Sequence, residues 1–298
     1  MSHPPSPTVR VVVPAQAELG EGAIWNPLDQ RLYWVDIEGR QLHILDPATG
    51  QDRALPTGGC VGTVVPTRDG AVLVALQTGL HRLNPVTGQL SLLQPPPMGP
   101  NLRFNDGKCD PAGRLWVGTL HLKGHPHCAA LYRFDPDGRL HTMLTGVSLS
   151  NGLAWSLDQG TMYYIDTLTR AVQAFDYEPA TGAITNGRVI IRIPDGAGDP
   201  DGMTIDAQGR LWIALWGGGQ VACFDPFTGQ QVAAVHVPAP HASSCAFGGP
   251  ELRTMFITTA RQGLSPAELA QYPLSGSVFA TEPGVAGVPA NIFGQVAR

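Results

Sequence analysis

Among the acidic and amide side chains that stand directly before a glycine and could bind a cation are those of the pairs Glu21-Gly22, Asp106-Gly107, Asn151-Gly152 and Asp201-Gly202. Carboxylates and amide carbonyls offer oxygen ligands, which suit a hard divalent cation. Taken singly, each pair is also an ordinary turn signal, because glycine and asparagine tolerate positive φ. Where the pairs lie relative to the strands of the fold therefore decides between a turn and a site.

A short strand signature recurs six times, 40 to 49 residues apart, as RLYWVD (31–36), AVLVAL (71–76), RLWVGT (114–119), TMYYID (161–166), RLWIAL (210–215) and TMFITT (254–259). Turn residues precede most copies, and a further strand with a Pro/Gly hairpin, such as HILDPATGQ, follows. Six units of about four strands predict an all-β chain folded as a six-bladed β-propeller. We expect VRVVV (9–13) to supply the outer strand of the last blade and so close the ring.

The polar residues share nearly the same position relative to these repeats. Glu21 and Asn151 lie ten residues before their signatures, Asp201 lies nine before and Asp106 eight before. The innermost strand of a blade starts at the central channel, so this register directs the side chains to one end of the channel, where glycine permits close backbone packing. The residues alone thus predict a central metal site to which Glu21, Asn151 and Asp201 bring oxygen ligands.

Composition limits the possible partners. The chain has 298 residues, a formal net charge of −5 and no cluster of Lys or Arg, which argues against nucleic acid and anionic membranes. A small-molecule ligand fits better, and we expect a monomer or weak dimer. We predict a disordered N-terminal segment (1–9), a single propeller domain (10–298) and, since no signal-peptide pattern is seen, a cytoplasmic location.

Cysteine and tryptophan positions add two expectations. The five cysteines are scattered without a C-x-x-C motif, so we expect buried thiols and neither a disulfide framework nor a thiolate zinc site. Within the strand repeats, Trp34, Trp116 and Trp212 are expected in the core between blades. A second set could shape the channel and consists of Trp25, Trp155 and Trp216.

Five motifs, in order, resemble those of the SMP-30/gluconolactonase/regucalcin family: LGEGAIW, NLRFNDGKCDPAGRLWVGT, SNGLAWS, PDGMTID and SCAFGGPELRTMFITTAR. The resemblance runs from about residue 17 to 290. It implies a six-bladed propeller with a divalent metal held by Glu21, Asn151 and Asp201, and substrate contacts from Arg103 and Asn105. The C-terminal part resembles bacterial sugar-acid lactonases of the xylonolactonase type.

The resemblance implies a metal-dependent hydrolase that opens a pentono- or hexono-1,4- or 1,5-lactone, such as xylonolactone or gluconolactone. Asp201 is expected to act as general base toward the attacking water, and Arg103 to hydrogen-bond sugar hydroxyls. Calcium is the first candidate for the cation, with Mg²⁺, Mn²⁺, Zn²⁺ and Fe²⁺ also open. Where some members have an acidic residue, this chain has His121, Leu122 and Lys123, so ring size and stereochemical preference stay open.

Two other functions remain open at this stage. A phosphotriesterase would use the same kind of metal centre, because a polarising cation also serves at phosphorus. A non-catalytic metal-binding propeller is the other, since YWVD (33–36) resembles the YWTD blades of binding modules. The histidine-rich stretch HLKGHPH (121–127) is expected to be an exposed loop. The chain has neither a G-x-S-x-G nor an H-E-x-x-H motif, so a nucleophile-elbow esterase and a zincin are unsupported.

Overall fold

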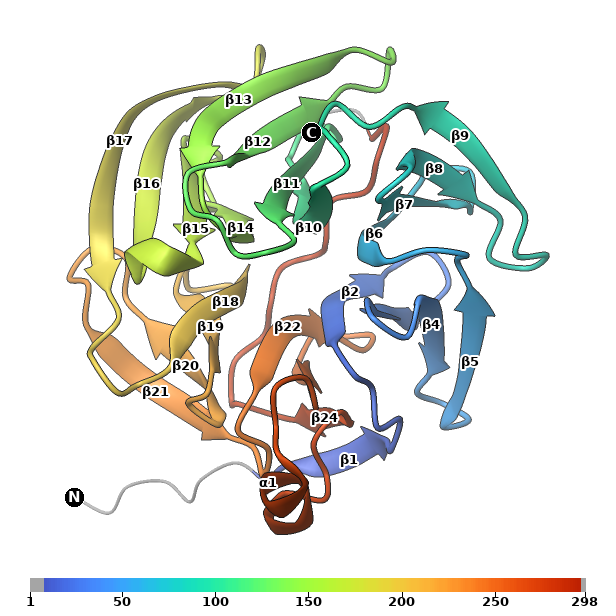
Figure 1. The fold of residues 1–298 in the computed structure, drawn as a ribbon. Coiled ribbons are helices and arrows are strands. Elements are labelled where there is room, and N and C mark those ends of the chain that lie inside the picture. The colour runs from blue at the N-terminus through green and yellow to red at the C-terminus, as the bar shows by residue number, and fades with distance from the viewer. Residues whose placement is uncertain (1–7, 296–298) are drawn as a thin grey trace.

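Six four-stranded antiparallel sheets are arranged around a central axis in the computed structural model, which describes residues 8–295 (Figure 1). This arrangement confirms the predicted six-bladed β-propeller. Residues 1–7 and 296–298 are outside the described residues, so the disordered segment (1–9) and the extent of the domain stay predictions. No helix within residues 8–295 is long and apolar enough to cross a membrane.

Each sheet runs from an inner strand near the axis to an outer strand at the rim (Figure 1). The first three sheets are β2 (Gly20–Asn26), β3 (Arg31–Asp36), β4 (Gln41–Asp46) and β5 (Gln51–Pro56); β6 (Val61–Pro66), β7 (Val72–Leu76), β8 (Gly79–Leu83) and β9 (Leu90–Gln94); β10 (Leu102–Cys109), β11 (Leu115–His121), β12 (Ala129–Phe134) and β13 (Leu140–Val147). The second strands β3, β7 and β11 fall on the first three sequence repeats.

The other three sheets are β14 (Ser150–Trp155), β15 (Thr161–Asp166), β16 (Ala171–Glu178) and β17 (Ala183–Arg192); β18 (Asp199–Ile205), β19 (Leu211–Trp216), β20 (Gln220–Phe224) and β21 (Gln231–His236); β22 (Ala242–Gly248), β23 (Thr254–Thr259), β24 (Val278–Thr281) and β1 (Arg10–Val13). The N-terminal strand β1 pairs with β24 and completes the last sheet, as predicted. This pairing joins the first and last strands along the chain and closes the ring.

The repeated sequence D-x-x-G-R-L-W explains two of the hairpins. Asp110 and Asp206 each accept two backbone hydrogen bonds within the turn, and each also accepts the indole N–H of the tryptophan six residues later at 2.9 Å. These tryptophans, Trp116 and Trp212, and the equivalent Trp34 are almost fully buried. Their predicted place in the core is confirmed, and each turn is fixed to the strand that follows it.

The inner strands approach one another closely because glycines stand where they touch. A Cβ atom on Gly152 would lie 2.6 Å from the Cβ of Met203 and 2.8 Å from the carbonyl oxygen of Asp201. No side chain larger than hydrogen fits there without moving β14 away from β18. Gly22 also has φ of +59°, a conformation that disfavours other residues.

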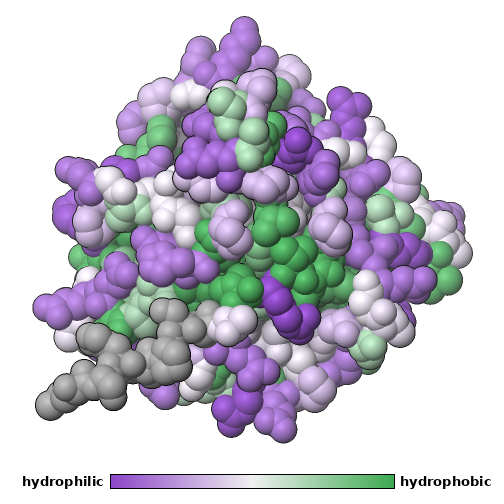
Figure 2. Space-filling model, turned by 90° about the horizontal axis from the view of Figure 1, so that it is seen from below, coloured by the Kyte–Doolittle hydropathy of each residue, from purple (hydrophilic) through white to green (hydrophobic). Residues whose placement is uncertain are grey.

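Residues 286–293 cross the ring at the end where the inner strands finish (Figure 1). Ala286 accepts a backbone hydrogen bond from Ala207, and farther along Phe293 donates one to Pro66. The segment therefore spans from the fifth blade to the second. Figure 2 shows the ring edge-on, from below the view of Figure 1: hydrophobic residues gather in the middle of this view, with hydrophilic residues around them.

Two features differ from the expectations. Cys109, Cys223 and Cys245 are buried, but Cys60 is half-buried and Cys128 is exposed in the loop after β11, so the prediction of buried thiols is wrong for these two. All five are free thiols, as expected. A short helix that was not expected, α1 (Pro266–Gln271), begins with a capping box formed by Ser265 and Glu268.

Candidate metal centre

Each predicted metal ligand lies at the start of an inner strand, within a break in the strand register. The breaks fall between Glu21 and Ile24 in β2, between Ser150 and Leu153 in β14, and between Pro200 and Met203 in β18. Such a β-bulge turns a side chain away from the regular alternation of the sheet. In each strand the polar residue and the glycine after it therefore belong to one β-bulge, which directs the polar side chain into the channel.

Two aspartates fix the approach to these strands. The Asp36 carboxylate at the end of β3 accepts hydrogen bonds from two successive backbone N–H groups just before β2, at 3.1 and 3.0 Å. Asp166 at the end of β15 does the same before β14, with both distances 3.0 Å. The last residue of the repeats RLYWVD and TMYYID thus holds the loop that leads to Glu21 and Asn151, respectively.

A chain of hydrogen bonds sets the orientation of the Asn151 amide. The hydroxyl of Thr167 donates its hydrogen to the carbonyl oxygen of Pro200 at 2.7 Å, so it accepts from Asn151 Nδ2, also at 2.7 Å. Asn151 Oδ1 accepts a bond from Asn105 Nδ2 at 2.8 Å and keeps a second lone pair for a ligand. The amide oxygen therefore faces the side where a cation would need it.

Glu21 and Asp201 place two carboxyl groups side by side in the interior. Each residue is only 6% exposed. Burial, the charge of Asp106 and the charge of the other carboxylate raise the pKa of Asp201 well above its ordinary value. Burial and the charge of Asp106 likewise raise the pKa of Glu21 to about 8, against the backbone N–H of Gly22 and a hydrogen bond with Asp201. A cation between the two carboxylates would remove this repulsion.

The donor set fits a hard divalent cation held partly by water. In the part of the chain that the structure describes, no three His, Cys, Asp or Glu side chains are arranged to hold a metal together. The candidate centre would consequently depend on the amide of Asn151 as its third protein ligand. Asp106 lies close enough to influence both carboxyl groups, and its own carboxylate accepts the Gly107 N–H at 2.7 Å.

Arg103 and Asn105 connect this centre to the rest of the channel. Arg103 Nη1 donates to Asn105 Oδ1 at 2.8 Å and to the carbonyl oxygen of Phe104 at 2.9 Å. The residue is 6% exposed, and burial lowers the pKa of its guanidinium. Within residues 8–295 it forms no ion pair, and no protein acceptor takes a hydrogen bond from its Nε or Nη2. Those N–H groups are available to a ligand.

The structure brings together all five residues singled out in the sequence and adds one that was missed. Thr167 follows directly after the repeat TMYYID, and that hydroxyl next to the strand end was the only signal for it. The histidine-rich stretch forms an exposed loop after β11 from residue 122 onward, as expected. The rings of His121 and His125 stack there with centroids 4.4 Å apart.

Comparison with known proteins places this arrangement among related chains. A Bacillus subtilis protein, provisionally named sugar lactone lactonase YvrE, is 39% identical over 268 residues, covering 90% of this chain and 92% of that protein. Regucalcin of Danio rerio is 39% identical over 284 residues, covering 94% of this chain and 96% of regucalcin.

A solved structure has the same fold as this chain. The crystal structure of a regucalcin from Agrobacterium tumefaciens, described as a calcium-binding protein, superposes with a TM-score of 0.92 at 28% identity. The superposition covers 97% of this chain and 98% of that one. The sequence model of the SMP-30/gluconolactonase/LRE-like region matches residues 19–261. The chain therefore belongs to the SMP-30/gluconolactonase/LRE-like family.

Proposed function

We propose that this protein is a metal-dependent lactonase that opens the ring ester of an aldonic acid, with Glu21, Asn151 and Asp201 as the metal ligands. The observation that carries the proposal is the convergence of two buried carboxyl groups with the oriented Asn151 amide at one end of the channel. The name of the Bacillus subtilis relative, and the calcium binding stated for the Agrobacterium tumefaciens structure, support the same reading.

A divalent cation at this site would polarise the lactone carbonyl and stabilise the negative charge that develops on its oxygen, by several kcal/mol. The residues of the chain supply the proton transfers. Asp201 can take a proton from the attacking water as general base and return it to the ring oxygen that leaves. Burial and the charges of Glu21 and Asp106 raise the pKa of Asp201 in the free protein, and a carboxylate with a raised pKa is a good proton acceptor.

Substrate binding is assigned to Arg103 and Asn105. Arg103 keeps Nε and Nη2 for the hydroxyl groups of a sugar lactone, while its Nη1 is held by Asn105. Asn105 in turn holds the amide of Asn151. The substrate-binding arm and the metal ligand are thus joined by hydrogen bonds, so that a hydroxylated ring would be fixed relative to the cation.

The finer assignments belong to this proposal as well. We propose a pentono- or hexono-lactone such as xylonolactone or gluconolactone as substrate, calcium as the cation and the cytoplasm as the location. The polar lining formed by Arg103, Asn105 and Asn151 suits a hydroxylated substrate better than an apolar ester.

The test is a substrate panel on metal-stripped protein, with Ca²⁺, Mg²⁺, Mn²⁺ or Zn²⁺ added back singly. It includes xylono-1,4-lactone, glucono-1,5-lactone, unsubstituted γ-butyrolactone and one phosphotriester. We expect metal-dependent hydrolysis of the sugar lactones. Glu21→Gln should abolish it, whereas Glu18→Gln, which changes an exposed carboxylate three residues earlier, should not. Hydrolysis of the phosphotriester alone would contradict the proposal.

A further inference from the structure

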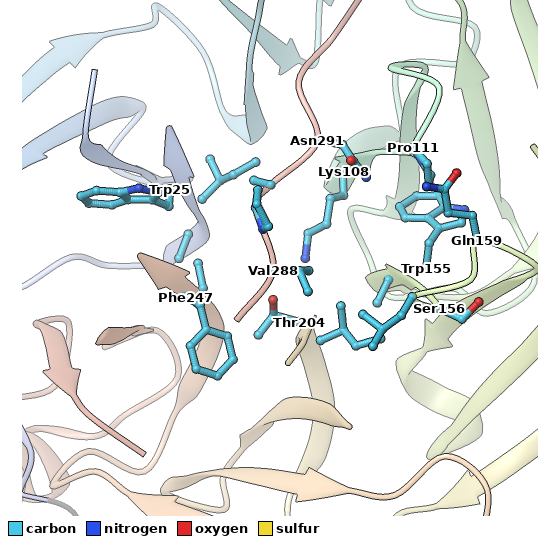
Figure 3. A pocket seen from close by; sticks show the side chains of 18 residues that line it. Trp25, Lys108, Pro111, Trp155, Ser156, Gln159, Thr204, Phe247, Val288 and Asn291 are labelled. Atoms are coloured by element: carbon cyan, nitrogen blue, oxygen red, sulfur yellow. The ribbon is translucent and has the colours of Figure 1, made fainter. Parts of the chain in front are cut away.

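A cavity lies at the opposite end of the channel from the candidate metal centre. It has a volume of about 220 Å³ and is lined by the last residues of several inner strands and by residues 288–291 of the C-terminal segment (Figure 3). Along β2, Trp25 in its wall is four residues beyond Glu21, and none of Glu21, Asn151 and Asp201 is among the residues that line it. The cavity is therefore separate from the candidate metal centre.

The walls of this cavity are mainly apolar and aromatic. Trp25 and Trp155 lie on opposite sides in Figure 3, and Phe247, Ile205 and Val288 also line it. A dry cavity of about 150 Å³ is large enough to hold benzene, so this one can hold a slightly larger flat molecule.

Lys108 is the one charged residue among those that line the cavity. Its ammonium group points between the two tryptophans (Figure 3) and donates to the carbonyl oxygen of Met203 at 2.6 Å. No carboxylate within residues 8–295 forms an ion pair with it inside 4.0 Å, so two of its three N–H donors have no protein partner. Burial lowers the pKa of Lys108 below its ordinary value, and the charge of Asp106 offsets only part of this effect.

We propose that this cavity binds a small monocarboxylate with a flat apolar body, its carboxylate against Lys108 and its body between the aromatic walls. An ammonium with unused donors in a partly open, mainly apolar site favours an anion, since a charged hydrogen bond is stronger there than in water. The mainly apolar wall offers few partners for the hydroxyls of a sugar acid, so a ligand with a flat apolar body fits better. The site is independent of the proposed lactonase reaction.

The experiment uses benzoate as the probe and benzamide as its uncharged counterpart. Each is titrated into metal-stripped full-length protein by isothermal calorimetry, so that the empty metal centre has no cation to attract a carboxylate. We expect one benzoate per chain, bound at least about tenfold more tightly than benzamide. Lys108→Met keeps the side-chain length and should remove this preference by weakening benzoate alone. The matched control Lys123→Met, on the exposed loop, should change nothing.

Two further variants test whether benzoate binds in this cavity and not at the metal centre. Val288→Phe, on the C-terminal segment, fills the cavity and should abolish binding of both probes even if Lys108→Met fails to fold. Asp201→Asn should leave benzoate binding intact. The proposal is overturned if benzoate does not saturate by roughly 10 mM, if Lys108→Met or Val288→Phe folds and binds benzoate as well as wild type, or if Asp201→Asn removes the binding.

Discussion

Replacing Thr167 with valine tests whether the Asn151 amide is held in place for a cation. Valine has nearly the same shape, so the variant removes one hydroxyl and its two 2.7 Å hydrogen bonds, to Asn151 Nδ2 and to the Pro200 carbonyl. A buried donor left without a partner costs about 1–3 kcal/mol. If about 1.4–2.8 kcal/mol of that cost is lost from the free energy of metal binding, because the amide is no longer held in the orientation that binds a cation, metal affinity falls by about ten- to hundredfold. This is the range typical for residues that orient a metal ligand.

The assay is calorimetric titration of Ca²⁺ into metal-stripped protein, together with thermal melting in chelator. Thr119→Val is the matched control, because Thr119 is likewise a buried threonine and also makes two hydrogen bonds, both with Ala130, at 3.1 and 3.0 Å. Both variants should lose similar stability, and only Thr167→Val should lose Ca²⁺ affinity. Equal Ca²⁺ affinity in the two variants would refute the assigned role of Thr167 and the ligand role of Asn151.

Three other predictions concern the same site. Asp201→Asn should lower kcat for a sugar lactone by about 10²–10⁴, because the amide cannot accept a proton; kinetics and metal content are measured together. Arg103→Ala should raise KM for xylonolactone by about ten- to hundredfold and hardly affect γ-butyrolactone, which has no hydroxyl to lose. The pKa of Glu21 in the free protein is raised to about 8, so below that pH a cation must displace the proton of Glu21 in order to bind. The affinity for Ca²⁺ should therefore rise between pH 6 and 8, by up to about tenfold per pH unit. Calorimetric titrations in buffers of different ionisation enthalpy would show the proton release.

Each of these predictions has an outcome that contradicts it. Near-normal kcat with full metal content in Asp201→Asn would make Asp201 a ligand only. Equal losses for both lactones in Arg103→Ala would place Arg103 in the metal centre or the fold instead of at the sugar hydroxyls. Ca²⁺ affinity that stays constant from pH 6 to 8 would show that Glu21 loses no proton on binding.

The blade pattern was predictable because it is local. Each repeat carries its own turn and strand. In DPAGRLW, for example, the Asp110 carboxylate accepts hydrogen bonds from the backbone of the turn and from the indole N–H of Trp116, all within seven successive residues. The position of Glu21, Asn151 and Asp201 relative to the repeats then followed from the symmetry of a propeller. Equivalent positions of successive blades lie around the same axis, so residues far apart in sequence meet there.

Features that depend on contacts between distant segments were not predictable in this way. Thr167 contributes to the site only because the 3₁₀ turn after β15 packs against Pro200 in the next blade. The cavity around Lys108 exists only because the C-terminal segment crosses the ring, and no periodic pattern marks that segment. The exposure of Cys128 follows from the length of the loop after β11, which the strand repeats do not determine.

The most direct test of the account is lactone hydrolysis measured against equivalents of Ca²⁺ added to metal-stripped protein. One cation held by Glu21, Asn151 and Asp201 predicts negligible activity without metal and a linear rise to a plateau at one Ca²⁺ per chain, with no rise in Glu21→Gln. Full activity in the stripped protein, or Ca²⁺ binding without any gain in hydrolysis, would contradict the account.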